Sequence, residues 1–525
     1  MVIFTLLHYY LCIPMISLRG KKVLVMGLGL LGGGVATTKW LVKQGARVTV
    51  TDLKTRKELL PSIKALGLAA KKVRFVLGRH DEEDFRAHDY IVVNPGVPKE
   101  SPYLKIAKRA HIRIINDAVL FFEYLPKENP IIAVTGTRGK TTTTNWIAHL
   151  LRARWPNVRA AGNTPENPLL KELERIVALP EWIPDQVRND NGDKYHTPVV
   201  LELSSWQLEY LPEAKRAPDI AVITNLYPDH LNRYTSIKEY AGAKANIFKN
   251  QTKKQALILN KDNEWTKWFL AQKPKSRVHY ISSSLISKYR DMEILRCRDI
   301  NMGEHNVQNL RAASLTAHLL GISWKDIHAR VSSLPAIRFR QEIVYEKNGL
   351  LIINDSASTS PEAGIAALRR FSKLAAQKKQ PLFFIAGGTD KGLSYKGWAE
   401  EVGMTQSTLA SEGLDFQLFL LEGSATEKIE KALEEYREEY PSPAVVGSGS
   451  SQNHTRFARS FVGDVEMSIS QDLEAIMKDV KKKVDEKGGG VVVFSPSAAS
   501  FLKFKNEFDR GERFNQLAQK YFVGK

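Results

Sequence analysis

The chain is poor in cysteine and in long apolar runs. Only Cys12 and Cys297 occur among its 525 residues, too few for a disulfide framework, and no cysteine spacing typical of a zinc site is present. The one extended apolar stretch, residues 1–16, is short for a membrane span and has no basic residue ahead of it. These absences favour a protein of the reducing cytoplasm without stable membrane insertion. We expect residues 1–16 to be an extra segment ahead of the first strand, with a membrane anchor as the alternative.

The chain also lacks an arginine-rich tract and any repeat of basic and aromatic residues, although its formal net charge is +19. A surplus of positive charge suits anionic partners, which include nucleic acid, a membrane surface and phosphorylated small molecules. Because the chain has neither an arginine-rich tract nor a basic–aromatic repeat, nucleic-acid binding is only an alternative function. The length exceeds what one hydrophobic core normally supports, so we expect several domains.

The first glycine-rich motif follows a short apolar strand. Gly27, Gly29 and Gly32 have Gly-x-Gly-x-x-Gly spacing, a helical pattern follows, and a second strand ends at Asp52. This layout matches the Rossmann fingerprint, in which glycines let a pyrophosphate approach the backbone at a helix N-terminus. The motif predicts a βαβ nucleotide-binding unit. An NAD-dependent dehydrogenase and a glycine turn that serves packing alone both stay open.

A second glycine-rich motif, "IIAVTGTRGKTTTTNW", combines an apolar strand, a tight turn and a helix. Gly136 and Gly139 allow backbone N–H groups to turn inward, Lys140 brings a point charge for phosphates, and Thr141 offers a hydroxyl to Mg²⁺. A standard phosphate loop would begin with glycine where this chain has Val134. The motif therefore predicts an ATP site with a shortened loop.

Two later strands end in residues suited to metal binding. The strand in "VVLELSSWQLE" carries Glu202 among apolar neighbours, where a carboxylate needs a counter-charge or a metal. We favour a Mg²⁺ ligand near Thr141, with a salt bridge as the alternative. The strand in "IAVITNLYPDHLNRY" delivers Asp229 and His230 to its C-terminal end, the edge at which parallel sheets bind ligands. In the helical stretch "YAGAKANIFKN", Lys244 has the pattern of a surface lysine when taken alone.

The remaining candidates lie further along the chain. Asn306 and Asn309 fall one helical turn apart and can face one ligand such as an adenine ring, although helix capping explains Asn306 equally well. In the last third, strands end at "NDS" with Asp355, at "AGGTDKG" with Lys391 and at "SPSAAS". Three strand ends with small or polar residues are suited to form the floor of a site for an acidic, amine-bearing substrate.

Strands and helices alternate along the whole chain, which predicts an α/β protein with parallel-type sheets. The stretch "EYLPKENP" interrupts this pattern after the first segment, and a third segment begins near "LPAIRFRQE". We expect three domains: a Rossmann-like domain over residues 1–127, a central P-loop-type ATPase domain over 128–335 and a Rossmann-like domain over 336–525.

In order, the motifs "GTRGKT", "ELSSWQLE", "NLYPDHLNRY", "YAGAKANIF", "GEHNVQN", "RQE", "INDS", "GGTDKG" and "SPSAAS" resemble those of the Mur ligase family. The family's short phosphate loop, GTxGKT/S, accounts for Val134. The resemblance runs from about residue 20 to the end of the chain. It implies an ATP-dependent ligase of peptidoglycan biosynthesis, most similar to the members that join D-glutamate to UDP-N-acetylmuramoyl-L-alanine through an acyl phosphate.

The resemblance also implies a role for each candidate residue. The ATP phosphates and a first Mg²⁺ are held by the phosphate loop, with Glu202 as a further metal ligand. A second Mg²⁺ is held by His230 and by Lys244, which the family carries as a carbamate. The full set of nucleotide residues is Gly136, Thr137, Gly139, Lys140, Thr141, Thr142, Asn309, Arg340 and Asp355. The substrate residues are Gly29, Gly32 and Asp52 for the UDP group, Asn163 near the transferred phosphate, and Thr359, Lys391 and Ser500 for D-glutamate.

Three positions depart from the family pattern. Arg138 stands where the phosphate loop usually has asparagine, and the sequence does not explain it. Ala357 follows "NDS" where many members carry lysine, which removes an expected charge partner of the D-glutamate side chain. The turn at Asn163 is "GNTPEN" and not "GNIG".

We expect a monomer with no NAD and no nucleic-acid partner. The alternatives are a sibling ligase for another amino acid, a dehydrogenase and a non-catalytic nucleic-acid-binding protein.

Overall fold

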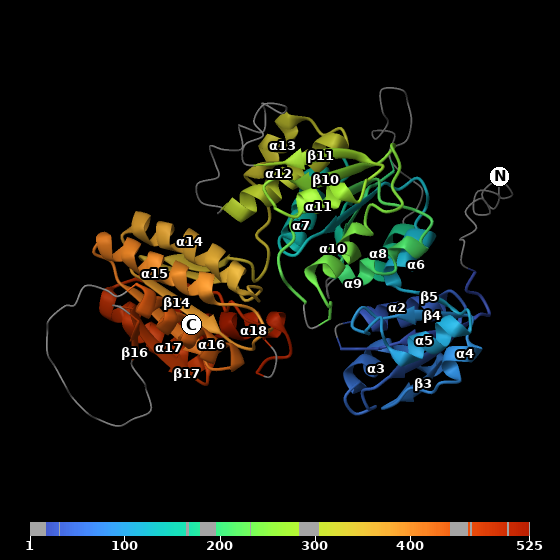
Figure 1. The fold of residues 1–525 in the computed structure, drawn as a ribbon, viewed down its shortest axis with the longest axis horizontal. Helices are drawn as coiled ribbons and strands as arrows, with labels where there is room; N and C mark the ends of the chain where they lie inside the picture. Colours follow the sequence, from blue (N-terminus) through green and yellow to red (C-terminus); the bar gives the residue numbers. More distant parts are fainter. Residues whose placement is uncertain are drawn as a thin grey trace. The chain divides into compact units, whose positions relative to one another are not determined.

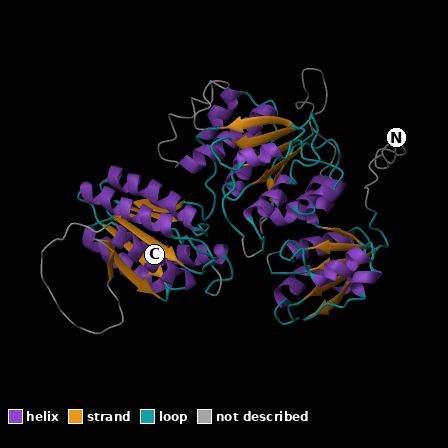
Figure 2. Ribbon diagram, in the orientation of Figure 1, coloured by secondary structure: helices purple, strands orange, loops and turns teal. Residues whose placement is uncertain are grey.

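The computed structural model describes residues 17–30, 32–163, 167–178, 196–230, 233–282, 304–440, 460–462, 465–500 and 503–523. Cys12, Cys297 and residues 1–16 lie outside that part. Within it the chain forms three sheets flanked by helices, as Figures 1 and 2 show. One compact unit contains the first two sheets together with Gln308–Pro335, and the other contains the third sheet within Ala336–Lys525. No described helix is long and apolar enough to cross a bilayer.

The first sheet has five parallel strands in the order β3-β2-β1-β4-β5. Its strands are β1 Lys22–Met26, β2 Arg47–Asp52, β3 Val73–Leu77, β4 Tyr90–Val93 and β5 Arg113–Ile115. Its helices are α2 Gly33–Lys43, α3 Leu60–Leu66, α4 Asp84–Ala87, α5 Pro102–Arg109 and α6 Asp117–Tyr124. The strand order reverses between β1 and β4, and this is the point at which open α/β sheets bind ligands.

The second sheet has six parallel strands in the order β11-β10-β9-β6-β8-β7. Its strands are β6 Ile131–Thr135, β7 Ala160–Gly162, β8 Val199–Glu202, β9 Ile220–Ile223, β10 Ala256–Asn260 and β11 Arg277–Ile281. Its helices are α7 Lys140–Leu151, α8 Leu169–Ala178, α9 Ser205–Leu208, α10 Ile237–Ala245, α11 Thr266–Ala271, α12 Glu304–Leu319 and α13 Trp324–Val331. Because β6 lies between β8 and β9, the ends of all three strands meet at one edge.

The third sheet has seven strands in the order β12-β13-β18-β14-β15-β17-β16, antiparallel only at its two edges. Its strands are β12 Glu342–Lys347, β13 Leu350–Asn354, β14 Leu382–Gly387, β15 Phe416–Leu421, β16 Ser460–Val462, β17 Val465–Ser470 and β18 Gly490–Phe494. Its helices are α14 Pro361–Lys378, α15 Lys396–Ser411, α16 Ser424–Glu439, α17 Leu473–Lys487 and α18 Glu507–Ala518. One core packs α14, α15 and α16 against one face of the sheet, and a second core packs α17 and α18 against the other.

The strands are continuous apolar runs because helices cover both faces of each sheet. Every residue of β6 and of β18 is buried, with no alternation between polar and apolar positions. The predicted α/β class with parallel sheets is therefore confirmed. Most of the candidate residues lie at the carboxyl ends of the strands or in the loops and helices that follow them.

Candidate active site

The turn between β6 and α7 requires glycine at two positions. Gly136 has a φ of 151°, and a Cβ atom there would lie 1.9 Å from Oγ1 of Thr224. Gly139, with a φ of 77°, would place a Cβ atom 2.1 Å from Oδ1 of Asn309. Other parts of the same unit therefore pack directly against the turn, and a side chain at either position would displace them.

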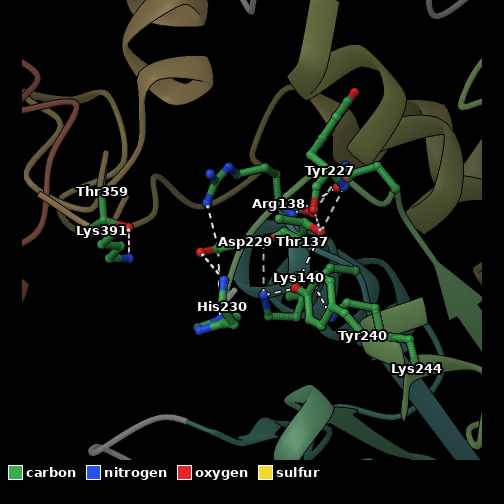
Figure 3. A network of polar contacts seen from close by, with 12 residues as sticks. Thr137, Arg138, Lys140, Tyr227, Asp229, His230, Tyr240, Lys244, Thr359 and Lys391 are labelled. Atoms are coloured by element: carbon green, nitrogen blue, oxygen red, sulfur yellow. Dashed lines mark hydrogen bonds and ion pairs between the residues drawn. The ribbon is translucent and has the colours of Figure 1, made fainter. Parts of the chain in front are cut away.

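Two lysine side chains converge on the carbonyl groups of this turn. Nζ of Lys140 donates to the oxygens of Gly136 and Thr137, at 3.0 and 3.1 Å. Nζ of Lys244, from α10, donates to the same Gly136 oxygen at 2.8 Å and lies 4.5 Å from the ring centre of Tyr240. Figure 3 shows both side chains reaching the turn from different elements.

The sequence of its helix suggests that Lys244 is a surface lysine, but the structure buries it. The residue is only 1 % exposed, because its face of α10 packs against the phosphate loop. Burial lowers the pKa of Lys244 well below its usual value. The positive charges of Lys140 and Arg138 lower this pKa further, whereas the carboxylates of Asp229 and Glu202 raise it. A buried amine with a lowered pKa is chemically reactive in a way that an exposed lysine is not.

Glu202 ends β8 beside the phosphate loop and is 4 % exposed. Its Oε2 atom has no hydrogen-bond partner among the described residues. The alternative of a close salt bridge is not what the structure shows there, since no described ion pair includes this carboxylate. A buried carboxylate oxygen without a protein partner has the chemistry of a Mg²⁺ ligand.

Arg138, Asp229 and His230 form a short chain of polar contacts at the mouth of the loop (Figure 3). Nη1 of Arg138 lies 3.4 Å from Oδ2 of Asp229, which is buried. The other carboxylate oxygen accepts the backbone N–H of His230 at 2.9 Å, and His230 takes a left-handed φ of 55°. The arginine that the sequence left unexplained is thus paired with the acid next to a candidate metal ligand.

Residues after β9 hold the backbone of the loop in place. Oδ1 of Asn225 accepts the N–H of Arg138 at 2.8 Å, and Oγ1 of Thr224 donates to the Arg138 carbonyl at 2.6 Å. The hydroxyl of Thr137 accepts the N–H of Tyr227 at 3.0 Å. The sequence did not single out these three partners of the loop, because nothing local in "ITNLYPDH" distinguishes them from an ordinary strand end.

The other expected nucleotide residues of this unit lie against the same helix. Thr141 and Thr142 open α7, and Asn309 of α12 lies 3.3 Å from Oγ1 of Thr143. Asn163 follows β7, and its backbone N–H donates to the Glu202 carbonyl at 3.1 Å. Asn163 therefore lies beside Glu202, and Asn309 lies beside the helix that follows the phosphate loop.

The first glycine turn is organised differently, by a carboxylate. Oδ2 of Asp52 accepts the backbone N–H groups of Leu28 and Gly29, at 2.9 and 3.1 Å. These two amides are therefore hydrogen-bonded within the turn itself. The later amides, from Gly32 into the first turn of α2, are the ones that a helix leaves without internal acceptors.

A small hollow lies beside this turn. It is lined by Gly27, Gly34, Asn94 and Asp117 among others. Nε2 of Gln207, from the "SSWQLE" stretch, donates to Oδ2 of Asp117 at 3.1 Å. Burial raises the pKa of Asp117 to about 6, although the hydrogen bond from Gln207 opposes this.

In the second unit, Asp355 lies where β13 and β18 end. Its Oδ2 accepts the hydroxyl of Ser495 at 2.8 Å, and its Oδ1 accepts the backbone N–H of Gln341 at 3.0 Å. Burial raises the pKa of Asp355 to about 7, against those hydrogen bonds and the charge of Arg340.

The other strand ends of this unit meet beside it. Nζ of Lys391 lies 3.4 Å from the hydroxyl of Thr359, a contact drawn in Figure 3. Thr389 and Ala499 exchange backbone hydrogen bonds of 2.9 and 3.0 Å, which brings the loop of Lys391 next to that of Ser500, itself 3 % exposed. The loops that carry Thr359, Lys391 and Ser500 therefore lie side by side within this unit.

The described residues contain no group of three His, Cys, Asp or Glu side chains placed to bind a metal ion. Glu202 and His230 supply one acidic and one imidazole donor, and Thr141 a hydroxyl. The donor set thus suits Mg²⁺ only with ligands from outside this class, such as hydroxyl, phosphate and a modified lysine.

Comparison with known proteins agrees with the geometry. Residues 134–317 match the Mur ligase middle domain, and residues 21–116 match the Mur ligase MurD-like N-terminal domain. A UDP-N-acetylmuramoylalanine–D-glutamate ligase of Roseiflexus sp. (strain RS-1) is 35% identical over 96% of this chain and 100% of its own length. The protein of the same name from Borreliella burgdorferi (strain ZS7) is 32% identical over 95% of this chain and 98% of its own.

Solved structures share the fold at lower identity. UDP-N-acetylmuramate-alanine ligase MurC from Thermotoga maritima has a TM-score of 0.53 at 16% identity, covering 95% of this chain and 99% of its own. MurF from Acinetobacter baumannii has a TM-score of 0.53 at 15% identity, covering 97% and 92%. The predicted resemblance is confirmed by relatives that match almost end to end. This chain belongs to the Mur ligase family.

Proposed function

We propose that this chain is the ATP-dependent ligase that joins D-glutamate to UDP-N-acetylmuramoyl-L-alanine in peptidoglycan biosynthesis. The relatives of that name, 30–35% identical over nearly the whole chain, support the choice of substrates. The observation that carries the reaction class is the phosphate loop, on which two lysines and a buried carboxylate converge. We further propose that the enzyme works as a monomer in the cytoplasm.

The reaction proceeds in two displacements. A carboxylate oxygen of the alanyl group attacks the γ-phosphorus of ATP, the bond to the ADP oxygen breaks, and an acyl phosphate forms. The D-glutamate nitrogen then attacks the acyl carbon, loses a proton, and phosphate leaves with the bonding electrons. Both steps depend on position and charge neutralisation, which Lys140 and the N-terminus of α7 supply to the phosphates.

Two Mg²⁺ sites fit the residues present. Thr141 and Glu202 would hold one ion, which would supply positive charge to neutralise the phosphate groups. His230 and a carbamylated Lys244 would hold the other. Carbamylation turns the buried amine into a carboxylate, which supplies the acidic ligand that the described residues lack as a cluster.

The remaining roles divide between the two units. In the first, the turn with Gly29, Gly32 and Asp52 binds the UDP group, and Asn163 lies near the transferred phosphate. In the second, Arg340 and Asp355 meet the nucleotide, and Thr359, Lys391 and Ser500 hold D-glutamate. The Thr359–Lys391 contact supports this assignment, because it places a cation and a hydroxyl donor together for a carboxylate.

Phosphate release from ATP in the presence of UDP-N-acetylmuramoyl-L-alanine, measured across a panel of amino acids, tests the proposal. We expect release that depends on D-glutamate. Release with L-lysine or diaminopimelate but not with D-glutamate would show a sibling ligase and refute the substrate assignment. Tight NADH binding without ATP consumption would refute the ligase class itself.

A further inference from the structure

The turn that carries Arg340 has an unusual backbone. Phe339 and Gln341, on either side of it, have left-handed φ values of 61° and 50°. Residues with side chains rarely adopt this conformation, so two of them around one arginine require restraint from neighbouring parts of the chain. These restraints fix the position of the Arg340 backbone and therefore of the Cα–Cβ bond from which its side chain extends.

The loop after β13 supplies the first restraints. The N–H of Gln341 donates to Oδ1 of Asp355 at 3.0 Å, and the N–H of Ala357 donates to the Phe339 carbonyl at 2.9 Å. These bonds attach the turn at both ends to the residues that follow the strand. They leave the side chain of Gln341 to be held by something else.

Arg370 of α14 holds that side chain. Its Nη1 donates to Oε1 of Gln341 at 2.7 Å. Its Nε is buried and has no hydrogen-bond acceptor among the described residues. The neighbouring Arg369 is different: its side chain is 62% exposed and pairs with Glu401. The two adjacent arginines of α14 therefore contact different parts of the unit, and Arg370 is the one that bonds to the turn that carries Arg340.

Charge accumulates around this contact. Burial lowers the pKa of the Arg370 guanidinium, and the carboxylate of Asp355 opposes that shift. Burial, with the charge of Arg370 in addition, lowers the pKa of His305 to about 4, so this imidazole stays neutral. Arg340 and Arg370 both act on the same buried carboxyl group, since the charge of each lowers the pKa of Asp355.

We propose that Arg370 is a positioning residue of the nucleotide site, which fixes the Arg340 turn through its hydrogen bond to Gln341. The inference rests on the proposed function only in taking a nucleotide as the ligand of Arg340.

The test compares single and double variants of the full chain. Arg370→Ala should weaken ADP binding, measured by calorimetry, about tenfold to thirtyfold, as the loss of a hydrogen bond to a charged group predicts. It should raise KM for ATP in parallel, with kcat and KM for the UDP-sugar changed less than about threefold. Arg369→Ala is the matched control and should stay within about twofold of the unchanged protein.

Restoring the charge separates positioning from general packing. Arg370→Lys should bind ADP within about threefold of the unchanged protein. Gln341→Ala, added to Arg370→Ala, should weaken ADP binding little further, because Arg370 acts through Gln341. An Arg370→Ala protein with unaltered ADP affinity, or a loss that Arg370→Lys does not recover, would overturn the proposal. If Arg370→Ala does not fold, Arg370→Lys and Gln341→Ala decide alone, and unaltered ADP affinity of Gln341→Ala contradicts it.

ADP binding is measured without UDP-sugar or amino acid. A failure of the D-glutamate assignment would therefore leave this result unchanged, and the two proposals stand or fall separately.

Discussion

The chain builds the same local motif twice, as a strand, a glycine turn and a helix, and stabilises the two copies in opposite ways. In the first turn a carboxylate, Asp52, accepts backbone N–H groups. In the second, two lysines donate to backbone carbonyl groups, and Nζ of Lys244 and Nζ of Lys140 share the oxygen of Gly136. Glycine spacing fixes the path of the backbone in both. We propose that the charges placed around it decide whether a turn only binds a phosphate group or also takes part in its transfer.

The largest difference between the turns is expected from Lys140. Lys140→Ala removes the charge that we propose neutralises the transferred phosphate, so kcat should fall about 10³-fold while the fold is retained. Phosphate release measures the loss, and Lys39→Ala, an exposed lysine on α2 of the first turn, is the matched control. A loss below tenfold would remove the distinction between the two turns.

Lys244 tests whether the second turn needs an acidic group made from an amine. Lys244→Ala should lower kcat about 10²-fold or more, and short carboxylates added to the assay should restore part of it, whereas amines should not. Lys238→Ala, an exposed lysine on the same helix, should be active. Rescue by amines, or none in a folded protein, would contradict carbamylation.

Asp52 tests the first turn. Asp52→Ala leaves the N–H groups of Leu28 and Gly29 without their acceptor, so the turn should loosen and KM for the UDP-sugar should rise about tenfold to a hundredfold. Steady-state kinetics should show kcat changed only a few-fold. If kcat falls as steeply as with Lys140→Ala, the first turn is not merely a binding element.

Arg138 should have a smaller effect on the second turn. Its contact with Asp229 is long, at 3.4 Å, and its side chain is 23% exposed, so the pair contributes modestly. Arg138→Asn should change kcat about twofold to fivefold and weaken the response to Mg²⁺, because Asp229 also fixes the backbone of His230. A Mg²⁺ titration of turnover measures both effects. An unchanged Mg²⁺ concentration at half-maximal turnover would show that Arg138 does not act on His230.

Asp117, beside the first turn, should affect stability and leave turnover nearly unchanged. Its pKa is raised from 3.8 to about 6, so the protonated form is favoured in the folded chain. This contribution is present below pH 4 and is lost as the pH rises through 6, about 3 kcal/mol for two pKa units. Relative to Asp117→Asn, the protein should therefore lose stability between pH 4 and 6. Parallel denaturation curves across that range would contradict the shift.

The sequence predicted the elements that depend on local pattern. The strand and helix around Gly136 and Lys140 follow from apolar runs and glycine spacing, and the place of His230 follows from the rule that parallel strands present ligand residues at their carboxyl ends. Glu202 was recognised because a carboxylate in an apolar strand needs a counter-charge or a metal ion. Each of these signals lies within a dozen residues.

Residues whose role depends on distant contacts could not be recognised in the same way. Lys244 resembles a surface lysine on its own helix, and only packing against the phosphate loop buries it. The carboxylate of Asp52 also accepts the N–H groups of Leu28 and Gly29 in its own turn, a contact that glycine spacing does not reveal. Arg370 lies next to another arginine in a helical pattern, and nothing local shows which of the two faces inward. Such contacts join residues far apart in the chain, so they are set by tertiary packing.

The central claim is that the second glycine turn transfers phosphate to a carboxylate. UDP-N-acetylmuramoyl-L-alanine labelled with ¹⁸O in its alanyl carboxylate tests this directly, with the released phosphate analysed by mass spectrometry. The account predicts one ¹⁸O atom in each phosphate, carried over when the acyl phosphate breaks down. Unlabelled phosphate, formed by attack of water on ATP, would contradict it.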